Sequence, residues 1–177
     1  VPEEEQEADA ARLRQERETA ARHAYLVGLA RAGRKAGVTQ YQCILPRESL
    51  PGAAHRFMDL VTARGGASFL CVMKDCGPQG RGLLSFPMPG FSIALDIPMR
   101  PETQALIDAL NAQVLADGGR IYLAKDGLSR PEHFQAMETR LGRWLQVRDA
   151  WDPHRRLRSA QSVRLLGDPA GTQGDET

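Results

Sequence analysis

Lysine is the scarce basic residue of this chain, and its positions mark candidate sites for chemistry. Of the 23 basic residues in the 177-residue sequence, 20 are arginine, and the lysines are Lys35, Lys74 and Lys125. A lysine supplies a compact ammonium that can lose its proton, whereas the arginine guanidinium stays charged. Lys35 belongs to a highly charged segment that is typical of a solvated surface. Lys74 and Lys125 each lie near the end of a run of β-forming residues, so the elements that position them decide their role.

The hydrophobic pattern predicts these elements. Apolar residues at helical spacing predict a helix over residues 49–63, which ends at two glycines, and another from Pro101 to Gly118. Runs of β-forming residues that stop at proline, glycine or charge predict strands at residues 39–45, 67–75, 91–97 and 120–125.

The order β-α-β-β-α-β predicts an α+β, ferredoxin-like domain over residues 38–126, in which a four-stranded antiparallel sheet carries its two helices on one face. Residues 1–37 are rich in Glu, Arg and Ala and predict a helical arm. Residues 127–167 predict a C-terminal helical extension, with one helix over residues 131–150 and a short basic segment after it. Residues 168–177 predict a disordered tail.

Side chains alternate between the two faces of a strand, so the sheet residues divide into two sets. The large apolar residues are expected to pack under the helices, and Tyr122 falls on their side. The other face would suit an oxygen-rich substrate, such as a sugar or a phosphate, as the wall of its pocket. Antiparallel sheets, however, commonly leave one face in solvent. The residues of this face are Gln40, Gln42, Leu70, Val72, Lys74, Ser92, Ala94, Leu123 and Lys125.

Composition excludes several functional classes. With 23 basic and 22 acidic residues, the net charge of +1 gives no electrostatic support for a nucleic-acid binder. No apolar run approaches the roughly 20 residues of a membrane span, and no signal-peptide pattern opens the chain. The three cysteines are an odd number without metal-ligand spacing, which predicts reduced thiols and a cytoplasmic location. The histidines form no metal motif, and neither GxGxxG nor a Walker loop offers a phosphate cradle.

Several ordered blocks of sequence resemble one known family over residues 39–166. They are similar to the C-terminal part of the FAD-dependent decaprenylphosphoryl-ribose 2-oxidases, which belong to the vanillyl-alcohol-oxidase-like FAD-linked oxidases. The blocks are QYQ at 40–42, ILP at 44–46, SFLCVMKDCGP at 68–78, LSFPMPGF at 84–91, DIP at 96–98, GGRIYLAKD at 118–126, and Asp152-Pro153 with Ser159.

The resemblance implies a substrate wall that covers a flavin. A sugar-alcohol carbon would pass a hydride to FAD, which is held mainly by an N-terminal domain that this chain lacks. Lys125 would be catalytic, because it would orient the hydroxyl, stabilise oxyanion charge or accept the proton. Tyr122 would contact the cofactor. The substrate-binding positions would be Gln40, Gln42, Lys74, Ser92 and Ala94, of which Ser92 and Ala94 replace an Asn and a Cys that are characteristic of these oxidases.

The sequence therefore predicts the substrate-binding domain of an FAD-linked oxidoreductase that acts on a CH–OH group and is inactive as an isolated chain. Its partners would be a sugar or sugar-phosphate substrate and an FAD-binding domain or subunit. A second copy of this chain is a further candidate partner, which would form a homo-oligomer through the uncovered wall. The alternative is a non-catalytic module that binds a ligand or a protein with the same face. An enzyme domain should direct Lys74 and Lys125 into one cavity, whereas a scaffold should direct them into solvent.

Overall fold

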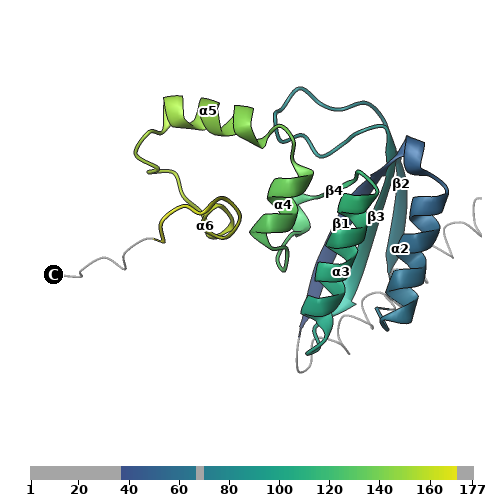
Figure 1. The fold of residues 1–177 in the computed structure, drawn as a ribbon. Helices are drawn as coiled ribbons and strands as arrows, with labels where there is room; N and C mark the ends of the chain where they lie inside the picture. Colours follow the sequence, from purple (N-terminus) through teal and green to yellow (C-terminus); the bar gives the residue numbers. More distant parts are fainter. Residues whose placement is uncertain (1–36, 67–69, 171–177) are drawn as a thin grey trace, which may run out of the picture.

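The computed structural model describes residues 37–66 and 70–170, whose arrangement is shown in Figure 1. The predicted arm, except Gly37, and residues 171–177 of the predicted tail lie outside the described residues. The strands are β1 (Val38–Pro46), β2 (Cys71–Cys76), β3 (Gly90–Pro98) and β4 (Arg120–Ile121). The helices are α2 (Gly52–Ala63), α3 (Thr103–Ala116), α4 (Pro131–Met137), α5 (Leu141–Trp151) and α6 (Ala160–Leu166), with 3-10 turns η1 (Arg47–Ser49) and η2 (Leu123–Lys125).

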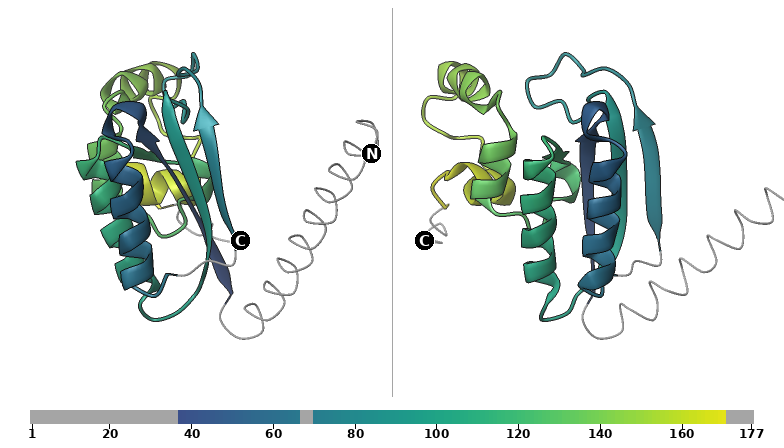
Figure 2. Two further views of the ribbon diagram at one scale, coloured as in Figure 1. Left: turned by 90° about the vertical axis from the view of Figure 1, so that its right-hand side faces the viewer. Right: turned by 45° about the vertical axis from the view of Figure 1, so that its right-hand side comes forward.

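The four strands form one antiparallel sheet in the order β2-β3-β1-β4. Helices α2 and α3 lie side by side on the same face of this sheet, and α4 lies beyond α3 toward β4 (Figures 1 and 2). An α+β fold with a four-stranded antiparallel sheet is thus confirmed, as is the order of its strands and the helices between them. The face without α2 and α3 is the one that the sequence predicted as a substrate wall.

The predicted fourth strand is too long. Sheet pairing of β4 ends at Ile121, after which the Tyr122 amide donates to the Gln42 carbonyl (2.8 Å) and the chain turns into η2. The Leu123 carbonyl, which a longer strand could offer to a ladder, accepts a hydrogen bond from the Gln161 side chain instead. Lys125 therefore lies in a 3-10 turn beyond the sheet and not on a strand.

The predicted helix over residues 131–150 is interrupted. Between α4 and α5, Glu138 leaves helical geometry (φ −97°, ψ 83°) and accepts hydrogen bonds from the backbone N–H (3.1 Å) and Nε (2.6 Å) of Arg140. Such local side-chain bonding competes with helix continuation. The break directs α5 away from the sheet domain, and none of its residues is fully buried.

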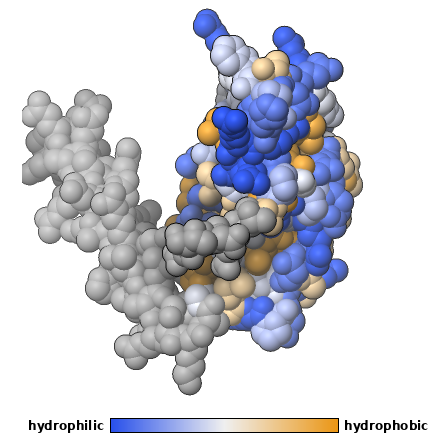
Figure 3. Space-filling view, turned by 90° about the vertical axis from the view of Figure 1, so that its left-hand side faces the viewer, coloured by the Kyte–Doolittle hydropathy of each residue, from blue (hydrophilic) through white to orange (hydrophobic). Residues whose placement is uncertain are grey.

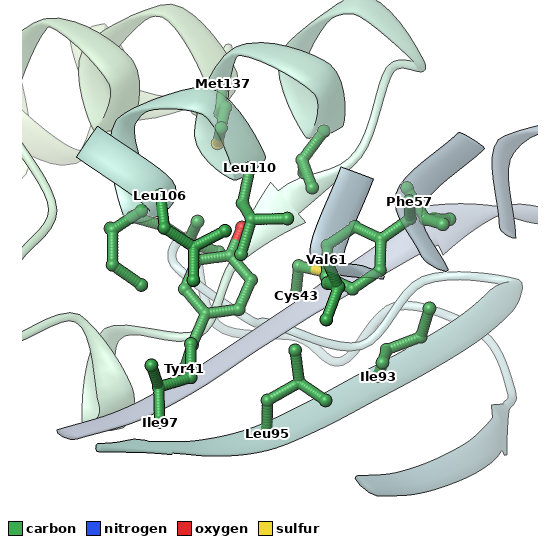
Figure 4. Close-up of a cluster of buried hydrophobic side chains, with 14 of the residues drawn as sticks. Tyr41, Cys43, Phe57, Val61, Ile93, Leu95, Ile97, Leu106, Leu110 and Met137 are labelled. Atoms are coloured by element: carbon green, nitrogen blue, oxygen red, sulfur yellow. The ribbon is translucent and has the colours of Figure 1, made fainter. Parts of the chain in front are cut away.

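The hydrophobic core lies between the helix face of the sheet and α2 and α3 (Figure 4). Phe57 of α2 and Leu110 of α3 are fully buried there, and each such side chain stabilises the fold by about 1.5–3 kcal/mol. The Tyr41 ring stacks on Phe57 with centroids 6.1 Å apart, and its hydroxyl donates to Asn111 Oδ1 (3.0 Å). Met73 has the parity of the core but remains 48% exposed, because β2 is an edge strand of the sheet.

The described residues include no helix that is long and apolar enough to cross a membrane. Nor do these residues bring three or more His, Cys, Asp or Glu side chains together as a metal site.

Candidate functional site

The register of the sheet defines the substrate wall. Residues that face each other across antiparallel strands share a face, and the pairings Gln42↔Ala94 and Val72↔Ala94 place these three residues in one row across β1, β3 and β2. A second row contains Lys74, Ser92, Ile44 and Arg120. We call this face the wall, and its described strand residues are Gln40, Gln42, Ile44, Val72, Lys74, Ser92, Ala94, Asp96 and Arg120.

Two hydrogen-bonded pairs organise the polar groups of the wall. Gln42 Nε2 donates to Ser92 Oγ (2.8 Å), and Gln40 Nε2 donates to Asp96 Oδ1 (2.8 Å). Gln42 and Ser92 are buried, as is Asp96, which was not among the predicted site residues although it shares their parity. These bonds fix the direction in which each amide presents its remaining donor and acceptor atoms.

Tyr122 lies on the opposite side from the one that was predicted. Because Cys43 pairs with Ile121, and Ile121 points into the core, the next residue falls beside Gln42 on the wall side. The Tyr122 ring packs against Phe86 with centroids 4.7 Å apart. Leu123 was predicted on the wall, but it packs partly against the core. The predicted parity was wrong for these two residues because the register of β4 directs its odd-numbered residues, such as Ile121, to the core and its even-numbered residues to the wall.

The two lysines are placed at opposite edges of the wall. Lys74 is exposed on the edge strand β2, and Lys125 is partly exposed in η2, just after the other edge strand. Three strand spacings separate β2 from β4, which corresponds to about 14 Å. Neither lysine lines any of four cavities found among the described residues, so their convergence on one cavity is not seen there.

A loop over residues 77–89 reaches the β4 edge of the wall. The Ser85 carbonyl accepts hydrogen bonds from Arg120 NH1 (3.0 Å) and from Arg140 NH2 (3.0 Å). Burial and the nearby Arg140 charge lower the pKa of Arg120, while the Glu138 carboxylate acts in the opposite sense. This double attachment holds Phe86 against Tyr122 and gives the long loop a defined position.

An apolar groove lies apart from the wall, between η2, α4, α5 and α6. Its volume is about 510 Å³, and Figure 3 shows the side of the molecule where orange, hydrophobic residues are set among blue, hydrophilic ones. Trp151 and Leu157 at its rim are 87% and 80% exposed. We call it the α5–α6 groove, and its lining residues include Leu84, Leu123, Trp144, Arg148, Trp151, Leu157, Gln161 and Leu165. Sequence reasoning treated this stretch only as a helical extension.

Arg148 organises the polar side of this groove. Its NH1 donates to Asp168 Oδ1 (3.0 Å), its NH2 donates to the Leu157 carbonyl (2.9 Å), and its guanidinium lies 5.4 Å from the centre of the Trp144 ring. The hydrogen bonds from Arg148 hold the pKa of Asp168 below its usual range, and they raise the pKa of Arg148. This ion pair therefore connects α5 to the segment after α6.

Known proteins are similar to this chain in sequence. Over an alignment of 135 residues, which covers 76% of the chain, it is 36% identical to decaprenylphosphoryl-beta-D-ribose oxidase of Mycolicibacterium smegmatis. The chain is homologous to the C-terminal part of this oxidase. It is also 34% identical, over 134 residues, to the uncharacterized protein in the mprA 5′ region of Streptomyces coelicolor, an alignment that covers 75% of the chain. No family model matches the chain.

The match with the oxidase is partial in length. The aligned part makes up 29% of the oxidase and 36% of the Streptomyces coelicolor protein, so the chain spans about a third of the curated relatives it matches. The predicted resemblance to the oxidase is confirmed at this level. Most of the oxidase has no counterpart in this chain, and surfaces that are exposed here can be interfaces in a longer protein.

The structure brings together only some of the residues that the oxidase resemblance assigns to the site. Gln42 contacts Ser92 through a hydrogen bond, and Tyr122 lies beside Gln42 along the sheet. Lys74 and Lys125 remain far apart across the sheet. The five proposed substrate positions nevertheless share the wall, namely Gln40, Gln42, Lys74, Ser92 and Ala94.

Proposed function

We propose that this chain is the substrate-binding part of an FAD-linked oxidoreductase that oxidises a sugar-type alcohol by hydride transfer to the flavin. The homology to decaprenylphosphoryl-beta-D-ribose oxidase supports the reaction class. The observation that carries the proposal is the wall itself, where the hydrogen-bonded Gln42 and Ser92 are buried and Gln40 is exposed, between two lysines on a sheet face that α2 and α3 leave open. Such an arrangement suits a ligand with many hydroxyl groups.

The residues at the β4 edge of the wall fit a flavin ring. Tyr122 and Phe86 offer aromatic surface for a flat, largely apolar ring system, and Lys125 follows on the same turn with a side-chain nitrogen that could face its carbonyl oxygens. Tyr122 would be the cofactor contact of this chain. The sequence has no glycine-rich phosphate cradle, so the remainder of FAD would be held by an FAD-binding domain or subunit.

The chain's own residues would orient the alcohol and handle its proton. A bound flavin would supply the two-electron oxidation by accepting the hydride from the alcohol carbon. Gln42, Ser92 and Lys74 would hold the sugar hydroxyls, and Gln40 would fix the buried Asp96. As the carbon–hydrogen bond breaks and the carbonyl forms, the hydroxyl proton would pass to Nζ of Lys125, acting as the general base.

The FAD-binding partner would cover the α5–α6 groove. Trp151 and Leu157 expose apolar surface that single-domain proteins normally bury, and the groove is continuous with η2, which carries Lys125. Asp152 and Arg158 line this surface beside Arg148, whose charge is paired with Asp168, so a mainly apolar counterpart would complement it. A partner seated there would also lie next to the β4 edge of the wall.

A second candidate function is a non-catalytic module that binds a ligand or a protein on the wall. It is favoured by one observation, because neither Lys74 nor Lys125 lines any of the four cavities described above. In the oxidoreductase, the missing side of the pocket would come from the FAD-binding partner. In the module, the wall would bind without any flavin.

The proposed function is tested by anaerobic flavin reduction in the complete oxidoreductase, expressed from its uninterrupted reading frame. A sugar-type alcohol such as a ribosyl phosphate should bleach the visible flavin absorption. Lys125→Met should slow the bleaching by about a hundredfold, as expected for loss of a general base. Lys35→Met is the matched control and should bleach at the normal rate. Equal rates for both variants would exclude Lys125 from the mechanism, and no bleaching of bound flavin by any sugar alcohol would overturn the proposed reaction.

A further inference from the structure

Helix α6 holds the turn that carries Lys125. Gln161 Nε2 donates to the Leu123 carbonyl, at the start of η2, and also to Asp126 Oδ2 (3.1 Å), at the residue after it. One amide thus bridges both ends of the turn. Lys125 is the last residue of η2, and its own N–H donates to the Tyr122 carbonyl (2.9 Å).

The acidic end of this turn is held firmly. The Asp126 side chain is only 8% exposed and accepts a second hydrogen bond from Arg164 NH2 (3.1 Å), also on α6. Arg164 NH1 donates to the Ser129 carbonyl, while Ser129 Oγ accepts from Asn111 Nδ2 (3.3 Å) in the core. A chain of polar contacts therefore runs from α6 through the turn to the core of the sheet domain.

The start of the turn is fixed to the wall. The Tyr122 N–H donates to the Gln42 carbonyl (2.8 Å), so η2 begins at the row that contains Gln42 and Ala94. Among the described residues, Gln161 provides the only side-chain hydrogen bond to the Leu123 carbonyl. Without it, the backbone after Tyr122 would lose this contact. The position of the turn that carries Lys125 is thus held by an α6 side chain from a separate part of the sequence.

We infer that Gln161 is a positioning residue that fixes the Leu123–Lys125 turn and thereby sets the position of Lys125 beside the β4 edge of the wall. The inference rests on the proposed function only in giving Lys125 a role in the reaction. Because Gln161 and Leu123 also line the α5–α6 groove, a partner in that groove would contact the residues that set the position of Lys125.

The test uses the chain itself and its three lysines, which give three resolvable signals in a protein labelled with [13C]lysine. Gln161→Met keeps the length and apolar packing of the side chain but removes both hydrogen bonds. Gln135→Met is the matched control, because Gln135 of α4 also donates to α6, from its Nε2 to the Leu165 carbonyl (2.9 Å), and this hydrogen bond does not involve η2. We expect Gln161→Met to shift and narrow the Lys125 signal, while the Lys74 signal stays in place. The control should leave both signals unchanged.

The outcomes separate positioning from general loss of structure. If the Lys125 signal of Gln161→Met matches that of the unaltered chain, the inference is overturned. If Gln135→Met moves it equally, α6 acts only through overall stability, and the inference also fails. In the complete oxidoreductase, Gln161→Met should slow flavin reduction about tenfold with unchanged substrate affinity. A moved Lys125 signal, together with normal reduction by Lys125→Met, would support positioning and contradict the proposed function.

Discussion

The side-chain amide of Gln42 donates a hydrogen bond of 2.8 Å to the hydroxyl of Ser92, and both residues are buried on the sheet face that lacks α2 and α3. The bond joins neighbouring strands β1 and β3. It satisfies one N–H of the side-chain amide and leaves the side-chain oxygen Oε1 and the other N–H for a ligand. The wall is therefore partly preorganised before any ligand arrives.

Ser92→Ala should destabilise the domain. The substitution leaves a buried Gln42 N–H without its acceptor, which costs about 1–3 kcal/mol. Urea unfolding measures the change in the free energy of unfolding. Thr62→Ala is a suitable control, because it removes an exposed hydroxyl that bonds within α2 and should change stability by about 0.5 kcal/mol or less. Equal stability of Ser92→Ala and the unaltered chain would show that water replaces the lost partner.

The three cysteines should differ in reactivity. Cys43 is fully buried, and this burial raises its pKa to about 12, so it has almost no thiolate near neutral pH. Cys71 is exposed and Cys76 partly exposed, although partial burial also raises the pKa of Cys71. A thiol titration of the native chain should therefore count two reactive groups, with the third appearing on denaturation. Rapid reaction of all three would mean that β1 is not buried as described.

Acid should loosen α5 through Asp168. Hydrogen bonding from Arg148 lowers the pKa of this carboxyl in the folded chain, so the pair stabilises the structure above the ordinary value of about 3.9. That contribution is lost as the pH falls through the lower folded value. Trp144 fluorescence should report the change, because the Arg148 guanidinium lies over its ring.

Two variants isolate this contribution. Asp168→Asn should remove most of the acid-dependent change in Trp144 fluorescence and should cost about 3 kcal/mol, because it breaks a largely buried ion pair. Asp108→Asn serves as the control, since Arg130 also lowers the pKa of Asp108, but this pair lies away from the tryptophans. An unchanged acid profile in Asp168→Asn would assign the transition to other groups, such as Asp152.

Binding of the FAD-binding partner should change tryptophan emission. The chain contains two tryptophans, and both Trp144 and Trp151 line the α5–α6 groove. Burial of Trp151, which is 87% exposed here, should shift the emission to shorter wavelength. Leu157→Asp should weaken binding at least tenfold, because a charge would replace an apolar contact at the rim. Partner binding with unchanged emission would place the interface elsewhere.

Much of the sheet domain could be predicted from sequence because its signals are local. Strands with alternating or apolar residues stop at Pro46 and Pro98, and the helical spacing of apolar residues that predicted α3 belongs to Leu106, Leu110 and Val114, all of which are buried. The wall residues of β1, β2 and β3 followed from period-two alternation. Their register confirms that they share a face.

The parts that sequence reasoning missed depend on individual side-chain hydrogen bonds, one of them between residues far apart in the sequence. The end of β4 follows from Gln161, which binds the Leu123 carbonyl from 38 residues away. The break between α4 and α5 depends on the turn of Glu138 toward Arg140, with no proline or glycine to announce it. The α5–α6 groove arises from that break. None of these features has a periodic signal in the chain.

The most direct test of the central claim is the visible absorption spectrum of the protein purified from its uninterrupted reading frame, together with any subunit that remains bound. The account predicts a yellow protein with flavin bands that bleach when a sugar-type alcohol is added without oxygen. A colourless protein that binds a sugar on the wall, and that acquires no flavin from any co-purifying subunit, would contradict the account and favour a non-catalytic binding module.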